Sequence, residues 1–430
     1  MRILPASLLL LATVSLLTEP TDSAVHQFAA LQSKLQAAHA AQDWPAYLSA
    51  AKQEKLFLNE DPDSLLQVAL AEIHLSDFNA ALRDLNQFAT MGQSADLPAR
   101  SSDFAALLGK PEYAELQSTM AANRKPISLA STAMQLPDAN LLPEDIDYDP
   151  GTHRFLITSV REKKILAIDA AGTGIDFAKS PDNWPMMAIK IDPTHDLLWA
   201  TEVALQGFTF VPKPDWGRSA LLCYDLRTGK LLHRVEGPKA SALGDMALTL
   251  NGDVIVSDGD GGGVYRMAVG ADALERVDNG DFLSPQTPAL HPDGQRIFVP
   301  DYERGIGILD LSTRRVHWLA TQGRFALNGI DGLYFNHGKL IAIQNGTSPE
   351  RVIVFTLNPA LSSVISETVI ERSTSTLGDP THGVVVGDDF YYIANSGWDL
   401  LDDQGKIKPG AALSRARLMR IRTTPLNRTQ

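Results

Sequence analysis

Cysteine is almost absent from this sequence of 430 residues, in which Cys223 is the only one. A single cysteine cannot form an intramolecular disulfide, and its lack of partners excludes zinc sites built from several thiolates. Because Cys223 lies within the apolar run 221–224, we expect it to be a small buried hydrophobic side chain. The fold must therefore be stable through packing alone.

Positive charge is also scarce, with 38 Lys and Arg residues against 51 Asp and Glu residues and a net charge of −13. A surface with this balance repels phosphate groups, so nucleic acid is not expected as a partner. The chain also lacks a G-x-S-x-G turn, an H-E-x-x-H helix and a G-x-G-x-x-G turn between a strand and a helix. Serine hydrolases, zinc proteases and nicotinamide-dependent enzymes are therefore disfavoured.

Long apolar segments are missing after residue 17, and residues 3–17 are the one stretch with membrane character. Arg2, this apolar run and the small residues Ser23-Ala24 have the order of a secretory signal peptide, with cleavage expected near Ala24. The run is shorter than the roughly 20 residues of a transmembrane helix, although a retained anchor is the alternative. We therefore expect residues 1–24 to be removed, leaving an exported, periplasmic protein without a membrane span.

Residues 25–125 are rich in Ala, Leu and Gln, with apolar side chains at three- and four-residue spacing, which predicts helices. Asp43-Trp44 and Asp77-Phe78 match at an offset of 34 residues, the period of the tetratricopeptide helix pair. A degenerate tetratricopeptide-like domain is one interpretation, and it would offer a surface to a protein partner. A plain helical bundle is the other.

From residue 126 onward the sequence changes to short β-branched runs separated by Gly, Asp, Asn and Pro, which is typical of all-β repeats. After a linker or outer strand at 126–142, six units follow over 143–425, at a mean spacing of about 47 residues, and 426–430 form a tail. The units begin near Pro143, Met187, Gly244, Gln286, Asn328 and His382. This spacing predicts a mainly β fold, a six-bladed β-propeller preceded by a small all-α helical-repeat domain.

The innermost strands of all blades in a propeller begin around one mouth of the central channel. Residues that open each unit should therefore converge there, however far apart they lie in the sequence. This places side chains near Glu144, Asp245, Gln286, Asp331 and His382 around one point.

The segment 143–150 followed by 154–169 resembles the opening blade of the senescence-marker-protein/gluconolactonase/LRE-like six-bladed propellers, relatives of paraoxonases, diisopropyl fluorophosphatase and strictosidine synthase. The resemblance spans about residues 130–425. It implies Ca²⁺ or a similar hard divalent cation at the channel mouth, and metal-dependent hydrolysis of a lactone or ester.

The family's metal ligands carry over in part. Its blade-one glutamate falls on Glu144 and its blade-five Asp-Gly on Asp331-Gly332, both intact, with Asn328 close before the latter. Its blade-three Asn-Asp reads Gly244-Asp245, so that the amide is missing, and its blade-four Asn is replaced by Gln286. The resemblance thus implies Glu144, Gln286, Asn328 and Asp331 as metal ligands.

The residue types themselves suit this chemistry, because carboxylate and amide oxygens are the ligands of Ca²⁺. Asp245 and His382 are the candidates for assisting water and for shuttling a proton. Each residue also has a structural interpretation; Asp before Gly, for example, is a common turn residue. The alternative function is a non-catalytic binding or scaffold protein, which the missing blade-three amide favours. At least four of the named oxygens within roughly 5 Å of one point would favour the enzyme, and a mouth filled by apolar side chains the scaffold.

Overall fold

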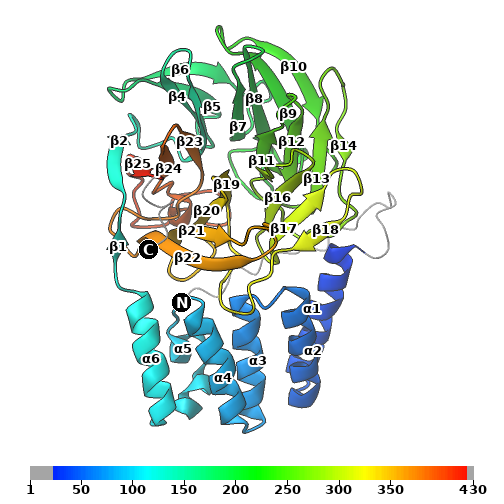
Figure 1. Ribbon diagram of the computed structural model, residues 1–430, viewed down its shortest axis with the longest axis vertical. Coiled ribbons are helices and arrows are strands. Elements are labelled where there is room, and N and C mark those ends of the chain that lie inside the picture. Colours follow the sequence, from blue (N-terminus) through cyan, green and yellow to red (C-terminus); the bar gives the residue numbers. More distant parts are fainter. Residues whose placement is uncertain (1–22, 424–430) are drawn as a thin grey trace.

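The computed structural model describes residues 23–423, with helices at one end of the molecule and a ring of β-sheets at the other (Figure 1). The helices are α1 (Ala24–Ala40), α2 (Trp44–Phe57), α3 (Pro62–His74), α4 (Phe78–Thr90), α5 (Leu97–Arg100), the 3-10 helix η1 (Ser102–Leu107) and α6 (Pro111–Asn123). The proposed signal peptide, apart from Ser23 and Ala24, and the tail at 426–430 lie outside the described residues. Within residues 23–423, no helix is both long and apolar enough to cross a membrane.

The 34-residue repeat falls on the beginnings of two helices. Asp43 caps α2 by accepting a hydrogen bond from the backbone N–H of Ala46, and Asp77 caps α4 in the same way through Ala80, both at 3.0 Å. Capping by Asp satisfies a backbone donor that has no partner inside the helix. Helices α1 to α4 pack in succession, and α6 packs against α4. That these units are tetratricopeptide-like stays a prediction.

Six antiparallel sheets follow, and they confirm the predicted six-bladed β-propeller. Blades one to three consist of β3 (Pro143–Asp149), β4 (Arg154–Ser159), β5 (Lys164–Ile168) and β6 (Gly174–Lys179); β7 (Met186–Asp192), β8 (Leu197–Val203), β9 (Ser219–Asp225) and β10 (Leu231–Glu236); and β11 (Leu243–Leu248), β12 (Val254–Asp258), β13 (Gly263–Met267) and β14 (Glu275–Arg276). Blade four consists of β15 (Ala289–Leu290), β16 (Arg296–Asp301), β17 (Gly305–Asp310) and β18 (Val316–Trp318); blade five of β19 (Gly332–Asn336), β20 (Lys339–Gln344), β21 (Arg351–Leu357) and β22 (Val364–Arg372); and blade six of β23 (Gly383–Val386), β24 (Asp389–Ile393) and β25 (Arg417–Arg422).

The ring is closed by a strand that precedes the first blade. β2 (Ser131–Gln135) pairs antiparallel with β25 and forms the outer strand of blade six. Blade six therefore combines residues from both ends of the propeller sequence. β1 (Ile127–Ser128) pairs with β22 as a fifth strand of blade five. Closure in this way covers the outer edge of β25 and ties the two ends of the propeller sequence together.

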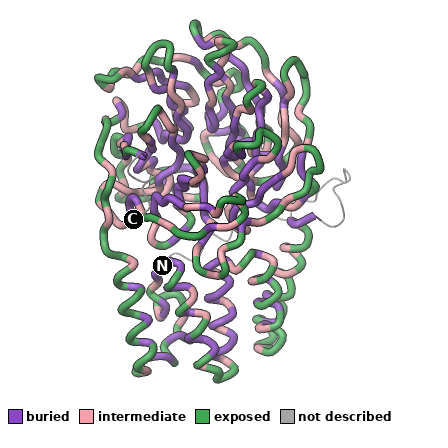
Figure 2. The backbone as a smooth tube through the Cα atoms, viewed as in Figure 1, coloured by how far each residue is buried: buried purple, intermediate pink, exposed green. Residues whose placement is uncertain are grey.

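The core lies between neighbouring blades, where buried residues gather along the strands (Figure 2). Between blades four and five, for example, Phe298, Leu340 and Phe355 are fully buried in one cluster. Each such side chain stabilises the fold by about 1.5–3 kcal/mol relative to exposure. Cys223 is buried in β9 as predicted, and burial, with a smaller effect of Asp192, raises the pKa of its thiol to about 11.

The helical region is fastened to loops of blades four and five. The guanidinium of Arg304 donates a hydrogen bond to the carbonyl of Phe57 at 3.1 Å, and the backbone N–H of Ser94 donates one to the carbonyl of Ser348 at 2.6 Å. Both Arg304 and Ser348 lie in connections between the second and third strands. In a meander these connections lie at the same end as the beginnings of the first strands, so the helices stand at that end of the channel.

Candidate functional site

Four ionisable side chains from four blades meet where the inner strands begin. They are Glu144 at the start of β3, Asp245 at the start of β11, Asp331 directly before β19 and His382 directly before β23. All four are buried, with 1% to 8% of each residue exposed. Glu144, Asp331 and His382 each offer a ligand atom, and these atoms all lie within 4.8 Å of one another.

His382 connects blades one, three and six through both of its ring nitrogens. Nδ1 lies 2.9 Å from the backbone carbonyl of Glu144, and Nε2 lies 2.5 Å from Oδ1 of Asp245. Because a carbonyl oxygen only accepts, Nδ1 carries a hydrogen. Burial by itself lowers the pKa of His382, but the charges of Asp331, Asp245 and Asp145 outweigh it and the pKa stands well above its usual value. His382 is therefore a buried imidazolium when its acidic neighbours are ionised.

The pKa values of the Glu144 and Asp331 carboxyl groups lie above those of ordinary surface acids. Burial raises the pKa of Glu144 to about 7, against the opposing effects of His382 and of the hydrogen bond from Trp398. Burial also raises the pKa of Asp331 well above its usual value; His382 opposes this shift, and the charges of Glu144 and Asp245 add to it. With all of its carboxyl groups ionised, the cluster would carry three negative charges, from Glu144, Asp245 and Asp331, against the one positive charge of His382, and the raised pKa values reflect the cost of that state.

Three neutral side chains fix the directions of these carboxylates. Trp398 donates its indole N–H to Oε2 of Glu144 at 2.5 Å. Thr287 donates its hydroxyl to Oδ1 of Asp245 at 2.5 Å, and Asn345 donates its amide to Oδ2 of Asp331 at 2.9 Å. Each acid thus keeps one defined orientation toward the channel axis.

Asp145, next to Glu144 in the sequence, has a structural partner. Its Oδ2 accepts hydrogen bonds from Nζ of Lys190 and from the backbone N–H of Ile189, both at 2.8 Å. These contacts join blade one to blade two. Lys190 is consequently the partner of Asp145 and is not free to neutralise Glu144 or Asp331.

Two residues that the sequence implied as metal ligands have their contacts elsewhere. Nε2 of Gln286 donates to the carbonyl and the hydroxyl oxygen of Ser284, at 3.2 and 3.0 Å. Asn328 lines a small cavity between Leu58–Asp61 of the helical region and Arg304, and its buried Oδ1 has no hydrogen-bond partner. The structure therefore brings Glu144, Asp245, Asp331 and His382 together, while the contacts of Gln286 and Asn328 lie outside this cluster.

Sequence reasoning missed the roles of Thr287, Asn345 and Trp398. Thr287 follows Gln286 directly, and a shift of one residue in the strand register would have found it. Asn345 belongs to Asn345-Gly346-Thr347, which matches a glycosylation acceptor and gives no signal for a role beside Asp331. Trp398 lies in the short helix η3 (Trp398–Leu400), and no local signal connects it with Glu144.

An apolar cluster, called here the apolar cover, lies at this mouth next to Glu144, which Trp398 of the cluster contacts. It contains residues at the beginnings of inner strands, at the ends of second strands and in two long loops: Leu142, Val160, Met187, Val203 and Leu401, with Leu205, Phe210, Ala242 and Trp398 packed against them. The loops 204–218 and 394–416 meet there, since Thr209 donates its backbone N–H to the carbonyl of Gln404 at 3.0 Å. The acids themselves are buried, with at most 8% of each residue exposed.

No family model matches the chain. No curated protein matches it either. Solved structures with a similar fold include a PQQ-bound aldose sugar dehydrogenase from Streptomyces coelicolor, at 14% identity and a TM-score of 0.47, covering 69% of this chain and 99% of that one. A gluconolactonase from Xanthomonas campestris has 14% identity and a TM-score of 0.46, with 69% and 88% covered. A luciferin-regenerating enzyme has 13% identity and a TM-score of 0.48, with 69% and 95% covered. At these values the likenesses say nothing about the chemistry of this chain.

The donor set of the cluster fits a divalent cation. Carboxylate oxygens from Glu144 and Asp331 and one imidazole nitrogen are ligands that such cations accept. A histidine that binds a metal usually donates its other ring N–H to a carbonyl or carboxylate, as Nδ1 of His382 does to the carbonyl of Glu144. Nε2 is then the available ligand atom, once the proton that it shares with Asp245 has left. A cation with two charges would also offset the excess of buried carboxylates.

Proposed function

We propose that this protein is a metal-dependent hydrolase that acts on a lactone or an ester at the mouth of its propeller channel. The observation that supports this most is the convergence of Glu144, Asp331 and His382, whose ligand atoms lie within 4.8 Å of one another. Two oxygens of the sequence-derived set belong to this group, from Glu144 and Asp331, rather than the four that were expected, and Oδ1 of Asp245 lies 2.5 Å from Nε2 of His382. The nitrogen of His382 stands as the further donor.

Glu144, Asp331 and Nε2 of His382 would hold the cation, and Ca²⁺, Mn²⁺ and Zn²⁺ all accept such a set. The cation would polarise the carbonyl of the substrate and lower the pKa of a water molecule. Asp245 lies 2.5 Å from Nε2 of His382 and is oriented by Thr287, so it is placed to accept a proton there. Trp398 and Asn345 hold the two carboxylates in position, and the apolar cover excludes bulk water from the site.

The first experiment is a titration of chelator-treated protein with Ca²⁺, Mn²⁺, Zn²⁺ and Mg²⁺ while its thermal midpoint is followed. A cation that binds only the folded state raises the midpoint, because it stabilises by RT ln(1 + [L]/Kd). We expect a rise with at least one cation, and its loss in Glu144→Gln and Asp331→Asn. The loaded protein is then screened against lactones and esters.

The matched control is Asp253→Asn, which changes another buried acid, at the far turn of blade three. The thermal midpoint of this variant can lie below that of the wild type, but the cation should raise both midpoints by the same amount. If no divalent cation raises the midpoint of the wild type, the hydrolase mechanism is wrong. A cation response without turnover on any lactone or ester would refute the activity and leave the cation site.

The second candidate function is a non-catalytic binding or scaffold protein. The apolar cluster at the mouth favours it, because a mouth filled by apolar side chains is the arrangement expected of a scaffold. In this case the imidazolium of His382 itself neutralises its neighbours, and no cation is needed. Absence of any cation response, together with strong destabilisation by His382→Gln, would support this function.

We also propose that the protein is exported and cleaved near Ala24, before the helical region begins. The contacts of the described residues favour a cut on the N-terminal side of Ser23. The Ser23 hydroxyl caps α1, and the backbone N–H of Ala24 donates to the carbonyl of Gly280 at 2.8 Å. N-terminal sequencing of protein from a periplasmic extract tests this, and an uncleaved chain in the membrane fraction would refute it.

A further inference from the structure

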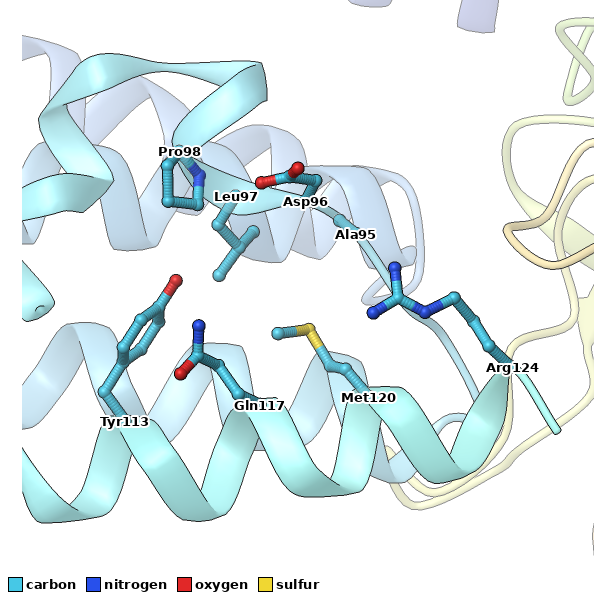
Figure 3. A pocket seen from close by; sticks show the side chains of 8 residues that line it. All are labelled: Ala95, Asp96, Leu97, Pro98, Tyr113, Gln117, Met120 and Arg124. Atoms are coloured by element: carbon cyan, nitrogen blue, oxygen red, sulfur yellow. The ribbon is translucent and has the colours of Figure 1, made fainter.

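The helical region contains a cavity of about 210 Å³, separate from the channel mouth. It lies between the segment 95–98 at the start of α5 and one side of α6 (Figure 3). Its apolar wall consists of Leu97, Tyr113 and Met120, each at most 3% exposed, with Pro98 beside them. At about 30 Å³ per water molecule the space holds about seven waters, so it admits a ligand the size of one amino acid.

The polar groups at this cavity carry one charge of each sign. Asp96 and Arg124 both line it from opposite sides, Asp96 at the start of α5 and Arg124 at the end of α6, and no ion pair joins them within residues 23–423 (Figure 3). Oδ1 of Asp96 accepts the backbone N–H of Ala99 at 3.3 Å, which leaves Oδ2 available. The side chains of Gln117 and Arg124 make no hydrogen bond or ion pair with other residues in the range 23–423.

We propose that this cavity binds a free α-amino acid with an apolar side chain. A carboxylate alone would be repelled by Asp96, and an amine alone by Arg124, whereas a zwitterion satisfies both. In this arrangement Arg124 binds the carboxylate, Asp96 and the amide oxygen of Gln117 bind the ammonium, and the side chain lies against Leu97 and Met120. The volume is below the roughly 300–1,000 Å³ of sites for larger ligands, which favours a single residue over a peptide.

The cavity also lies next to the junction with the propeller. Asn123, adjacent to Arg124, donates its amide to the carbonyls of Ala89 and Gln93, and Arg372 of blade five donates to the carbonyl of Lys125. These bonds hold the end of α6 in place whether or not a ligand is bound. Such fixed walls reduce the conformational entropy that the protein loses when a ligand binds.

Calorimetric titration of the full chain with L-leucine, L-methionine and L-phenylalanine tests the proposal. We expect saturable binding of at least one of them, and at least tenfold weaker binding of 4-methylpentanoate and isopentylamine, the leucine analogues that lack one charged group. Arg124→Gln and Asp96→Asn should each weaken binding at least tenfold. Both residues are exposed, and Asn retains the helix cap, so these variants keep the thermal midpoint of the wild type.

The control is Arg100→Gln, which removes an exposed guanidinium of the same helical region that pairs with Asp63. It should leave the affinity unchanged. The proposal is overturned if none of the three amino acids binds at millimolar concentration, or if both analogues bind as tightly as leucine. It is equally overturned if glycyl-leucine binds and leucine does not, because the site would then recognise the end of a peptide chain and not a free amino acid. None of these outcomes depends on the channel-mouth cation.

Discussion

Arg351, at the start of β21, joins the propeller to the helical region. Replacing it is predicted to uncouple the unfolding of the helical region from that of the propeller. The side chain of Arg351 is fully buried. Nε donates to Oε1 of Gln344 at 2.7 Å, and Nη1 donates to the carbonyl of Met91 at 3.2 Å. Gln344 cannot turn its amide around, because its Nε2 already donates to the carbonyls of Ala326 and Asn328.

In Arg351→Met, two buried acceptors lose their donor. Each hydrogen bond from a charged donor contributes about 1.5–3 kcal/mol. Removing one partner of a buried charged network costs about 3–5 kcal/mol, and relief of the buried guanidinium offsets part of the loss. We therefore expect the free energy of unfolding to fall by about 3 kcal/mol. Arg351→Lys should lose less, since an ammonium can keep one of the two bonds.

Urea unfolding with two signals measures this loss. The helical region contains only Trp44 of the six tryptophans, so near-ultraviolet circular dichroism reports mainly on the propeller, and ellipticity at 222 nm reports mainly on the helices. Coincident transitions in the wild type should separate in Arg351→Met, with the helices unfolding first. The exposed Arg315→Met is the control and should stay within about 0.5 kcal/mol of wild type. Coincident transitions and a loss below about 1 kcal/mol in Arg351→Met would refute the reasoning.

Three further predictions concern other parts of the chain. Burial, partly opposed by hydrogen bonds from Ser64, raises the pKa of Asp61 to about 8. The folded state therefore binds more protons than the unfolded state, and stability falls as pH rises from about 4 to 8. Thermal scans should show that Asp61→Asn flattens this pH dependence, whereas the control Asp63→Asn does not. Asn345→Ala should weaken cation binding about tenfold, because Asp331 loses its orienting bond, and thermal titration measures it; an unchanged affinity would show that Asn345 does not position Asp331. Gly346→Ala should lower the free energy of unfolding, measured in urea, by about 1–3 kcal/mol, because a Cβ there would lie 2.6 Å from Cα of Gly329 and from the Tyr302 ring. The control Gly378→Ala, where the nearest neighbour of a Cβ lies at 3.8 Å, should leave it unchanged.

The propeller could be predicted because each blade is specified by local signals. A strand, an Asp-Pro or Asp-Gly turn and a second strand recur at a regular spacing, and such turns depend on residues only a few positions apart. The same regularity places the first residues of the inner strands around one mouth. Glu144, Asp245, Asp331 and His382 come together for this reason, although no two of them are closer in the sequence than 51 residues.

The finer contacts of the site do not follow from the repeat. Thr287 rather than Gln286 contacts Asp245, because neighbouring residues of an extended segment point in opposite directions and the register is set by pairing with the next strand. Trp398 reaches Glu144 from a loop of more than twenty residues between β24 and β25, and its path depends on packing against Phe208 of another blade. No pattern near Trp398 encodes that contact.

The sequence by itself determined the number of blades, the helical nature of residues 25–125 and the burial of Cys223, because turn chemistry, periodicity and hydrophobicity act over short distances. Only the tertiary structure decided that the helices stand at the same end as the acidic cluster, held there by Arg304 and Arg351. It also decided that an apolar cover lies over that cluster. Both depend on contacts between segments more than 190 residues apart, whose mutual fit is a property of the packed molecule and not of any local pattern.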